Sequence, residues 1–353
     1  METNDILTKI PPVSDRDITT VDLIPESRSA TLFEGLVLRV DSGLYIVHAD
    51  PDKNNSPRRV VCSLRGNLRK NFTYSTSGSQ PRRVMKAKRS HNMDVVAVGD
   101  RVRFTPIEPG SGIIEEVYPR NSHFSRSSFR GREQTLVTNL DQLVIVFACA
   151  EPNPDLWRLD RWLASAESSG LEPLIVANKR DRVDEATFAE RFDEYKRIGY
   201  IVLETSAKAD LGIDDLRAAL QGRISAFTGP SGVGKSSLLN ALQPGLKLAT
   251  GEVGETTFKG KHTTTVRELI PLESGGWVAD TPGLRQLDLL NMTRGDLLNC
   301  FIEFVPFLDT ACRFRNCRHD NEPDCVLKKA VASGEISSRR YESFLQLATQ
   351  TKD

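Results

Sequence analysis

The chain lacks a hydrophobic stretch long enough to cross a membrane. Its longest apolar run, Leu143–Ala150, is far shorter than the roughly 20 residues that a membrane-spanning helix needs. The segment Met1–Ala30 is polar and lacks the apolar core of a secretory signal. Only six cysteines occur among 353 residues. We therefore expect a cytoplasmic protein of two or three domains, in a reducing compartment where disulfides are disfavoured.

Net charge is also absent, because 47 basic residues balance 47 acidic residues, but the two signs are unevenly placed. Residues 1–57 hold 5 Lys or Arg and 10 Asp or Glu, whereas residues 58–103 hold 12 and 2. The second stretch favours a surface that faces nucleic acid. The polar, acidic segment 1–31 is predicted to be a disordered tail.

The motifs that are present are those of guanine-nucleotide binding, but their order is unusual. In chain order they are Asn178-Lys179-Arg180-Asp181, Ser206-Ala207-Lys208, Gly229-Pro230-Ser231-Gly232-Val233-Gly234-Lys235-Ser236-Ser237 and Asp280-Thr281-Pro282-Gly283. An ordinary GTPase runs from the phosphate loop through the magnesium switch to the base loops. Here the base loops come first. The order therefore predicts a circularly permuted α/β GTPase domain over residues 136–290, a rearrangement that a compact domain with close termini tolerates.

The phosphate loop fits the pattern G-x-x-x-x-G-K-[ST], whose backbone N–H groups cradle phosphates. An apolar run, 224–227, precedes it and a helical pattern, 236–242, follows it, which is the context the motif requires. Lys235 is expected to neutralise the β- and γ-phosphates, and the Ser236 hydroxyl to bind Mg²⁺.

The base loops specify guanine. The Asp181 carboxylate only accepts hydrogen bonds and can take both N–H donors of the guanine edge. Asn178 is expected to tie neighbouring loops together, Lys179 to lie over the base, and Ser206-Ala207-Lys208 to place a backbone N–H near the guanine oxygen. Alone, the pattern N-K-x-D is equally consistent with a solvated loop. Combined with the phosphate loop it indicates GTP or GDP.

The switch regions are assigned by their distance from the phosphate loop. Asp280 is expected to reach Mg²⁺ through water and the Gly283 N–H to sense the γ-phosphate. Thr264, within Thr263–Thr265, is assigned as a Mg²⁺ ligand, although sequence leaves the choice among the three open. Leu284 stands where many GTPases carry a water-positioning glutamine, so hydrolysis should be slow or use another group. His262 is the nearest candidate base, with a solvated switch-loop histidine as the alternative.

Upstream, residues 32–118 carry about five short β-rich runs, which suits an OB-type barrel. The stretch Asn71–Met93 is predicted to be a long mobile loop. Its Phe72 and Tyr74, with nearby Arg and Lys, suit stacking and phosphate contact on RNA; the alternative is a solvated basic loop. Residues 119–135 are predicted to be a linker.

Downstream, residues 291–353 are predicted to be a mainly helical, metal-binding domain. Cys312, Cys317, His319 and Cys325 supply three thiolates and one imidazole, the donor set of a structural zinc site. Cys62, Cys149 and Cys300 lie in apolar surroundings and are expected to be core residues. Tyr341, Phe344, Leu345 and Ala348 follow helical spacing, which predicts a terminal helix with one packed face.

The permuted motifs, the barrel before them and the Cys₃His set after them together resemble one family, the bacterial ribosome small-subunit-dependent GTPase A or RsgA type. The resemblance covers residues 32–350 and includes His262-Thr263-Thr264-Thr265. It implies a late-acting, monomeric 30S assembly factor that binds 16S rRNA, holds zinc through those four residues and hydrolyses GTP when stimulated by the subunit. Two alternatives stay open: a non-enzymatic RNA-binding checkpoint protein that senses GTP, and a permuted GTPase of large-subunit assembly.

Overall fold

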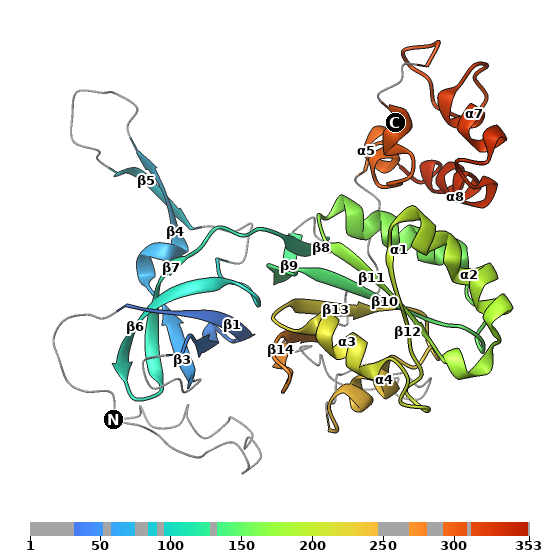
Figure 1. Ribbon diagram of the computed structural model, residues 1–353. Coiled ribbons are helices and arrows are strands. Elements are labelled where there is room, and N and C mark those ends of the chain that lie inside the picture. The colour runs from blue at the N-terminus through green and yellow to red at the C-terminus, as the bar shows by residue number, and fades with distance from the viewer. Residues whose placement is uncertain are drawn as a thin grey trace, which may run out of the picture.

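The computed structural model describes residues 32–51, 58–74, 84–89, 95–127, 133–245, 268–280, 292–308 and 312–351. Three units follow one another along the chain: a β-barrel, a larger α/β domain and a small helical module, which is drawn in red in Figure 1. This order of three units confirms the predicted order of domain types. Within the described ranges, no helix combines the length and the apolar character needed to span a bilayer.

The barrel consists of five strands: β1 (Phe33–Asp41), β2 (Leu44–Ala49), β3 (Arg58–Leu64), β6 (Arg101–Glu108) and β7 (Ser111–Val117). Neighbouring strands run in the order β1-β2-β3-β7-β6, and β6 pairs again with β1, which closes the barrel. Only β3 and β7 pair in parallel within it. Apolar side chains that alternate along these strands, among them Val37, Val47 and Phe104, fill the interior. This is the predicted OB-type barrel.

The stretch between β3 and β6 contains more regular structure than the sequence predicts. A short 3₁₀ helix, η2 (Gly66–Arg69), leads into β4 (Lys70–Tyr74), which pairs antiparallel with β5 (Val84–Arg89). The hairpin projects away from the barrel in Figure 1. The prediction of a mobile loop over Asn71–Met93 is therefore wrong for residues 71–74 and 84–89. The two strands pair through backbone hydrogen bonds, which a sequence rich in Ser, Gly, Lys and Arg does not reveal.

The predicted linker, 119–135, also contains a strand pair, because β8 (His123–Ser127) pairs with β9 (Glu133–Thr138). The fully buried Asp100 carboxylate joins this pair to the barrel. It accepts hydrogen bonds from Arg120 Nε and Nη2 at 2.7 and 2.8 Å and from the Thr138 hydroxyl at 2.7 Å. The barrel is thus fixed to the chain that follows it by a satisfied buried charge.

The α/β domain is built on a six-stranded sheet. Its strands are β10 (Gln142–Ala148), β11 (Glu172–Asn178), β12 (Ile201–Glu204), β13 (Ile224–Thr228), β14 (Glu268–Pro271) and β15 (Trp277–Asp280). They lie in the order β12-β11-β10-β13-β15-β14, and all pair in parallel except β14 with β15. The base-loop strands β11 and β12 therefore precede β13 in the chain yet lie in the same sheet, which is the geometry of a permuted domain.

Helices cover both faces of this sheet, as Figure 1 shows. They are α1 (Leu156–Ser168), η3 (Arg180–Arg182), α2 (Glu185–Ile198), α3 (Ile213–Leu220) and α4 (Lys235–Leu242). Leu143, Ile145 and Phe147 of the central strand pack with α1 and α2, whereas Val144 and Val146 pack with α3 and α4. Because β10 is buried on both faces, its sequence is a continuous apolar run.

The sheet continues into the barrel through β14, whose Glu268 pairs with Arg39 of β1. Beside this junction, the rings of His48 and Trp277 lie edge to face with centroids 4.9 Å apart. The barrel is therefore attached to β14, the strand that follows the predicted switch residues His262–Thr265 in the chain.

The C-terminal module contains α5 (Arg294–Asn299), α6 (Val305–Leu308), α7 (Val326–Ser333) and α8 (Ser338–Ala348). Phe301, Phe304 and Phe344 form its aromatic centre, with ring centroids 5.0 to 5.7 Å apart. The predicted apolar stripe of the terminal helix packs into this core. The prediction of buried Cys62, Cys149 and Cys300 is likewise confirmed.

Candidate functional site: guanine-nucleotide loops and a Cys₃His cluster

The phosphate loop runs from the end of β13 to the start of α4 and depends on glycine. At Gly229, where φ is +141°, a Cβ would lie 2.1 Å from the Val146 carbonyl oxygen. At Gly234, where φ is +95°, it would lie 2.3 Å from Asn178 Nδ2. The Lys235 ammonium donates to the carbonyls of Gly229 and Pro230 at 2.8 and 2.6 Å, so it lies at the mouth of the loop. The loop packs so closely on its neighbours that only glycine fits at positions 229 and 234. Its backbone N–H groups at the start of α4 are of the kind that bind phosphate.

Asn178, at the end of β11, connects the three loops of the site. Its amide Nδ2 donates to the Val233 carbonyl at 2.8 Å, and its Oδ1 accepts from the Ala207 N–H at 3.3 Å and the Thr205 hydroxyl at 3.4 Å. The side chain is 2% exposed. An amide offers both a donor and an acceptor, so it satisfies this buried position where a carboxylate would not.

Lys179 lies in the left-handed region, with φ of +61°, and spans two further segments. Its Nζ donates to the Gly232 carbonyl at 2.8 Å and to the Glu151 carbonyl. Glu151 also forms an ion pair with Arg182, and Pro152 Cδ lies 3.8 Å from where a Gly232 Cβ would be. Sequence reasoning missed residues 151–152, because they follow β10 in a segment that carries no nucleotide motif.

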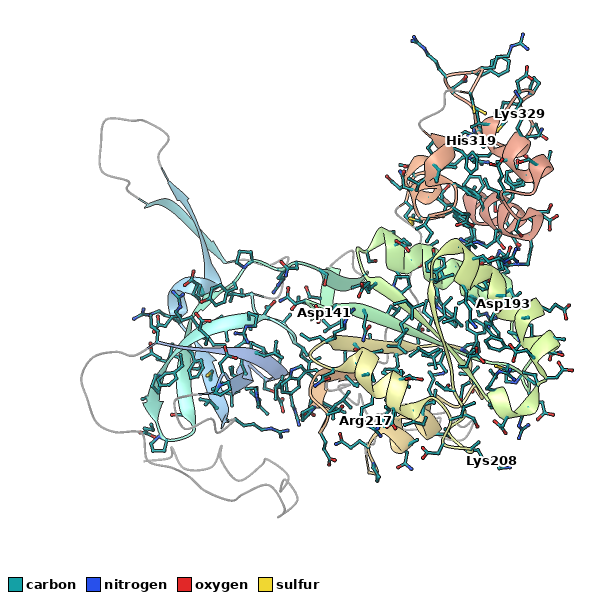
Figure 2. The ribbon with its side chains drawn as sticks, in the orientation of Figure 1. Asp141, Asp193, Lys208, Arg217, His319 and Lys329 are labelled. Carbon is teal, nitrogen blue, oxygen red and sulfur yellow. The ribbon has the colours of Figure 1, made fainter. Side chains whose placement is uncertain are left out.

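The Asp181 carboxylate is held by Ser206, whose hydroxyl donates to Asp181 Oδ1 at 2.5 Å. The Ser206 oxygen in turn accepts from the Ala209 N–H at 3.1 Å. The two predicted base loops are therefore joined through the Asp181 carboxylate. The Asp181 side chain is exposed to solvent. Lys208 is exposed at the edge of the domain, where Figure 2 labels it.

Arg180 points away from this carboxylate and anchors the loop. Its Nε donates to Glu204 at 2.8 Å, and its guanidinium lies 4.8 Å from the Phe188 ring centroid. Hydrogen bonding to Glu204 raises the pKa of Arg180, so the charge is retained. Within the motif, Arg180 is a structural residue.

The switch residues are only partly described. Asp280 ends β15, next to β13, and its backbone pairs with Glu268 of β14. His262, Thr264 and Gly283 lie outside the described residues, as does Leu284. Their assigned roles stay predictions.

A second site lies in the C-terminal module, where Cys312, Cys317, His319 and Cys325 converge. Their donor atoms all lie within 4.8 Å of one another, and His319 Nδ1 is 3.6, 3.8 and 3.3 Å from the three sulfurs. Tetrahedral zinc, with bonds of about 2.0 to 2.3 Å, places its ligand atoms roughly 3.3 to 3.8 Å apart. The three distances from His319 lie within this range, so the cluster could hold such an ion.

The surroundings of the cluster suit metal binding. The His319 N–H lies 3.4 Å from Cys317 Sγ and the Val326 N–H 3.5 Å from Cys312 Sγ, as donors to thiolates would. Burial lowers the pKa of His319 from 6.5, because removal from water penalises the imidazolium. The neutral, metal-binding form thus persists to more acidic pH than in an ordinary histidine.

The permuted sheet, the phosphate loop and the paired guanine loops define a circularly permuted GTPase. The RsgA GTPase family model matches residues 117–290. The chain is 42% identical to the small ribosomal subunit biogenesis GTPase RsgA of Moorella thermoacetica, over 88% of this chain and 95% of that protein. It is 36% identical to the RsgA of Thermotoga petrophila, over 89% and 95%.

Two solved structures share the whole arrangement. The crystal structure of YjeQ from Thermotoga maritima matches with a TM-score of 0.70 and 33% identity, over 91% of this chain and 98% of that one. YloQ, a circularly permuted GTPase, matches with a TM-score of 0.69 and 28% identity, over 93% and 97%. The chain therefore belongs to the RsgA family and is a GTPase.

The first prediction concerns the clearance between Gly234 and Asn178. Gly234→Ala should weaken GDP binding at least about tenfold, because the methyl group displaces the Asn178 amide and strains the backbone, together costing about 1.4 kcal/mol or more. Gly245→Ala is the control: its φ is +86° but no atom lies within 4 Å of the added Cβ. Titration with a fluorescent GDP measures both variants. An equal loss in the two would show that the Asn178 contact is unimportant.

The second prediction concerns the metal. Cys317→Ala should reduce bound zinc from one ion per chain to none and unfold residues 312–325 locally, because structural zinc supplies much of such a module's folding free energy. Cys300→Ala, in the same module but outside the cluster, should keep its zinc. Elemental analysis with GDP titration measures both properties. Zinc retained by Cys317→Ala would contradict the assignment.

Proposed function

We propose that the chain is a cytoplasmic, GTP-hydrolysing factor for biogenesis of the small ribosomal subunit, that it contacts 16S rRNA, and that the 30S particle stimulates its hydrolysis. The observation that carries this proposal is a permuted sheet that bears the phosphate loop and both base loops, flanked by an OB-type barrel and a Cys₃His module. The match to two relatives named for small-subunit biogenesis covers 95% of the length of each relative.

The geometry supports the nucleotide chemistry. Asp181, which accepts a hydrogen bond from Ser206, would accept from the two N–H donors of guanine, and adenine would leave this carboxylate unmatched. Lys235 would exchange the carbonyls of Gly229 and Pro230 for phosphate oxygens. Ser236, at the start of α4, would hold Mg²⁺ together with Thr264 and, through water, Asp280.

The Cys₃His cluster is proposed to hold one zinc ion. Its role is structural, since four protein donors close a tetrahedron and leave no position for a substrate. The sequence between the ligands Cys312 and Cys317 includes the exposed Phe314, with Arg313 stacked at 5.7 Å from its ring centroid. Such a basic, aromatic loop is suited to contact RNA.

The basic stretch 58–103 supports RNA contact, but fewer of its charges are available for that contact than its composition indicates. In the barrel, Arg101 pairs with Asp50 at 2.5 Å, Arg103 with Glu116 at 3.0 Å, and Arg65 with Glu115. These pairs reduce the positive potential of the barrel wall. We therefore assign most of the rRNA contact in this domain to the hairpin of β4 and β5, whose sequence is rich in Lys and Arg.

The third prediction concerns base choice. Asp181→Asn should weaken GTP binding by about tenfold to a hundredfold, because hydrogen bonds to a charged acceptor contribute about 1.5 to 3 kcal/mol. It should favour xanthosine triphosphate, whose edge suits an amide. Asp193→Asn, on α2, serves as the control and should bind GTP normally. Competition titrations measure each affinity. Wild-type protein that binds ATP as tightly as GTP would contradict the assignment of residues 178–181.

The fourth prediction concerns stimulation. Mature 30S subunits should raise kcat for GTP hydrolysis about tenfold or more, a barrier reduction of at least about 1.4 kcal/mol, and the effect should fall steeply with added salt. Lys235→Ala should abolish hydrolysis. His262→Ala should lose most of the stimulated rate but little GTP affinity, as expected for a contact made in the transition state.

Multiple-turnover phosphate release measures these rates, and 50S subunits are the control. Equal stimulation by 50S subunits would contradict the small-subunit assignment. A fully stimulated His262→Ala would contradict the role of His262 alone.

A further inference from the structure

A buried ion cluster joins the C-terminal module to the GTPase domain. Arg340 of α8 is 1% exposed and donates to Asp160 Oδ1 of α1 at 2.7 Å, where Asp160 is fully buried. The same guanidinium forms two hydrogen bonds with Glu303 at 2.6 and 3.0 Å and lies 4.4 Å from the Phe301 ring centroid. Arg340 therefore belongs to the module's core and reaches out of it to α1.

The adjacent Arg339 extends the cluster to α2. Its Nη1 donates to Asp160 Oδ2 at 2.7 Å, and its Nε and Nη2 donate to Glu194 at 2.9 and 2.5 Å. The Tyr195 hydroxyl donates to Asp160 at 2.7 Å. Burial raises the pKa of Tyr195, so the phenol keeps the proton that it donates. Two successive arginines thus hold α1 and α2 together from outside the domain.

These two helices lead directly from the nucleotide loops. Helix α1 begins after residues 149–155, whose Glu151 carbonyl binds Lys179. Helix α2 begins after the loop that carries Asp181, with Asp184 as its N-cap. A change in the relative position of α1 and α2 therefore alters the segments that Lys179 spans.

The contact is too costly to open freely. Separation of the module would leave the buried Asp160 with the Tyr195 hydroxyl alone and Arg340 with Glu303 alone, and removing one partner from a buried ion cluster is strongly destabilising. Apolar packing reinforces it, because Ala164 of α1 belongs to the module's core and Ile302 packs against the core of the GTPase domain. The module and the pair α1 and α2 therefore move as one body.

We propose that Arg339 and Arg340 are positioning residues that couple the placement of the zinc module to nucleotide retention. His319, in the zinc cluster, lies at the outer end of the module and is well separated from Lys208 in Figure 2. A force on that end reaches the guanine loops through α8, the arginines and the two helices. By linkage, bound nucleotide stabilises the docked module to the same extent.

Dissociation of a fluorescent GDP from the full-length protein tests this coupling without ribosomal particles, so the result is independent of the proposed function. Arg339→Gln should release GDP about fivefold faster or more, the lower end of typical coupling between sites. Lys329→Gln is the control, because this exposed lysine lies on α7 of the same module and pairs with Asp324 within it. Both variants should retain one zinc ion. Wild-type release from Arg339→Gln with zinc retained would overturn the proposal.

Hydrogen exchange of α8 provides the reciprocal measurement. GDP should slow exchange of the α8 amides in the wild type and in Lys329→Gln, but not in Arg339→Gln. If Arg339→Gln loses zinc, Glu194→Gln replaces it, since this change removes the partner from the GTPase side and leaves the module's sequence intact. Wild-type GDP release and GDP-dependent protection in Glu194→Gln would then overturn the proposal.

Discussion

The nucleotide site depends on one buried amide. Asn178 connects the end of β11 to Val233 in the phosphate loop and to Thr205 and Ala207 in the second guanine loop. The loops can meet there only because Gly234 has no side chain. Its donor and its acceptor are both used and the side chain is buried, so an aliphatic replacement would leave the Val233 carbonyl and the Ala207 N–H without this partner. The three loops consequently form one rigid receptor.

The permutation changes what is attached to this receptor. The barrel is paired with β14, at the edge of the sheet, and the C-terminal module is packed on α1 and α2, on one face. Either attachment reaches an element that adjoins the nucleotide loops. The central domain is therefore connected on two sides, and the connection to the C-terminal module uses buried ion pairs that are costly to break.

Local patterns carried much of this information. Alternating apolar residues predicted the barrel strands, a continuous apolar run marked β10, and four closely spaced donors predicted the metal cluster. The hairpin of β4 and β5 was missed because the stretch is rich in Ser, Gly, Lys and Arg, a composition typical of loops, whereas backbone pairing defines its strands. Within the basic stretch 58–103, arginines such as Arg101 pair with carboxylates from elsewhere in the chain, and the local composition does not show these pairs.

The sequence by itself determined the chemistry of the guanine and metal sites, because motif residues act through backbone geometry and donor type at short spacing. Only the tertiary structure decided what supports them. Glu151 reaches Lys179 through a carbonyl group that every residue has, so no side-chain pattern identifies it. Asp160 and Arg340 are 180 residues apart, and each alone resembles a surface charge. Their burial follows from the packing of α8 on α1, which no local pattern encodes.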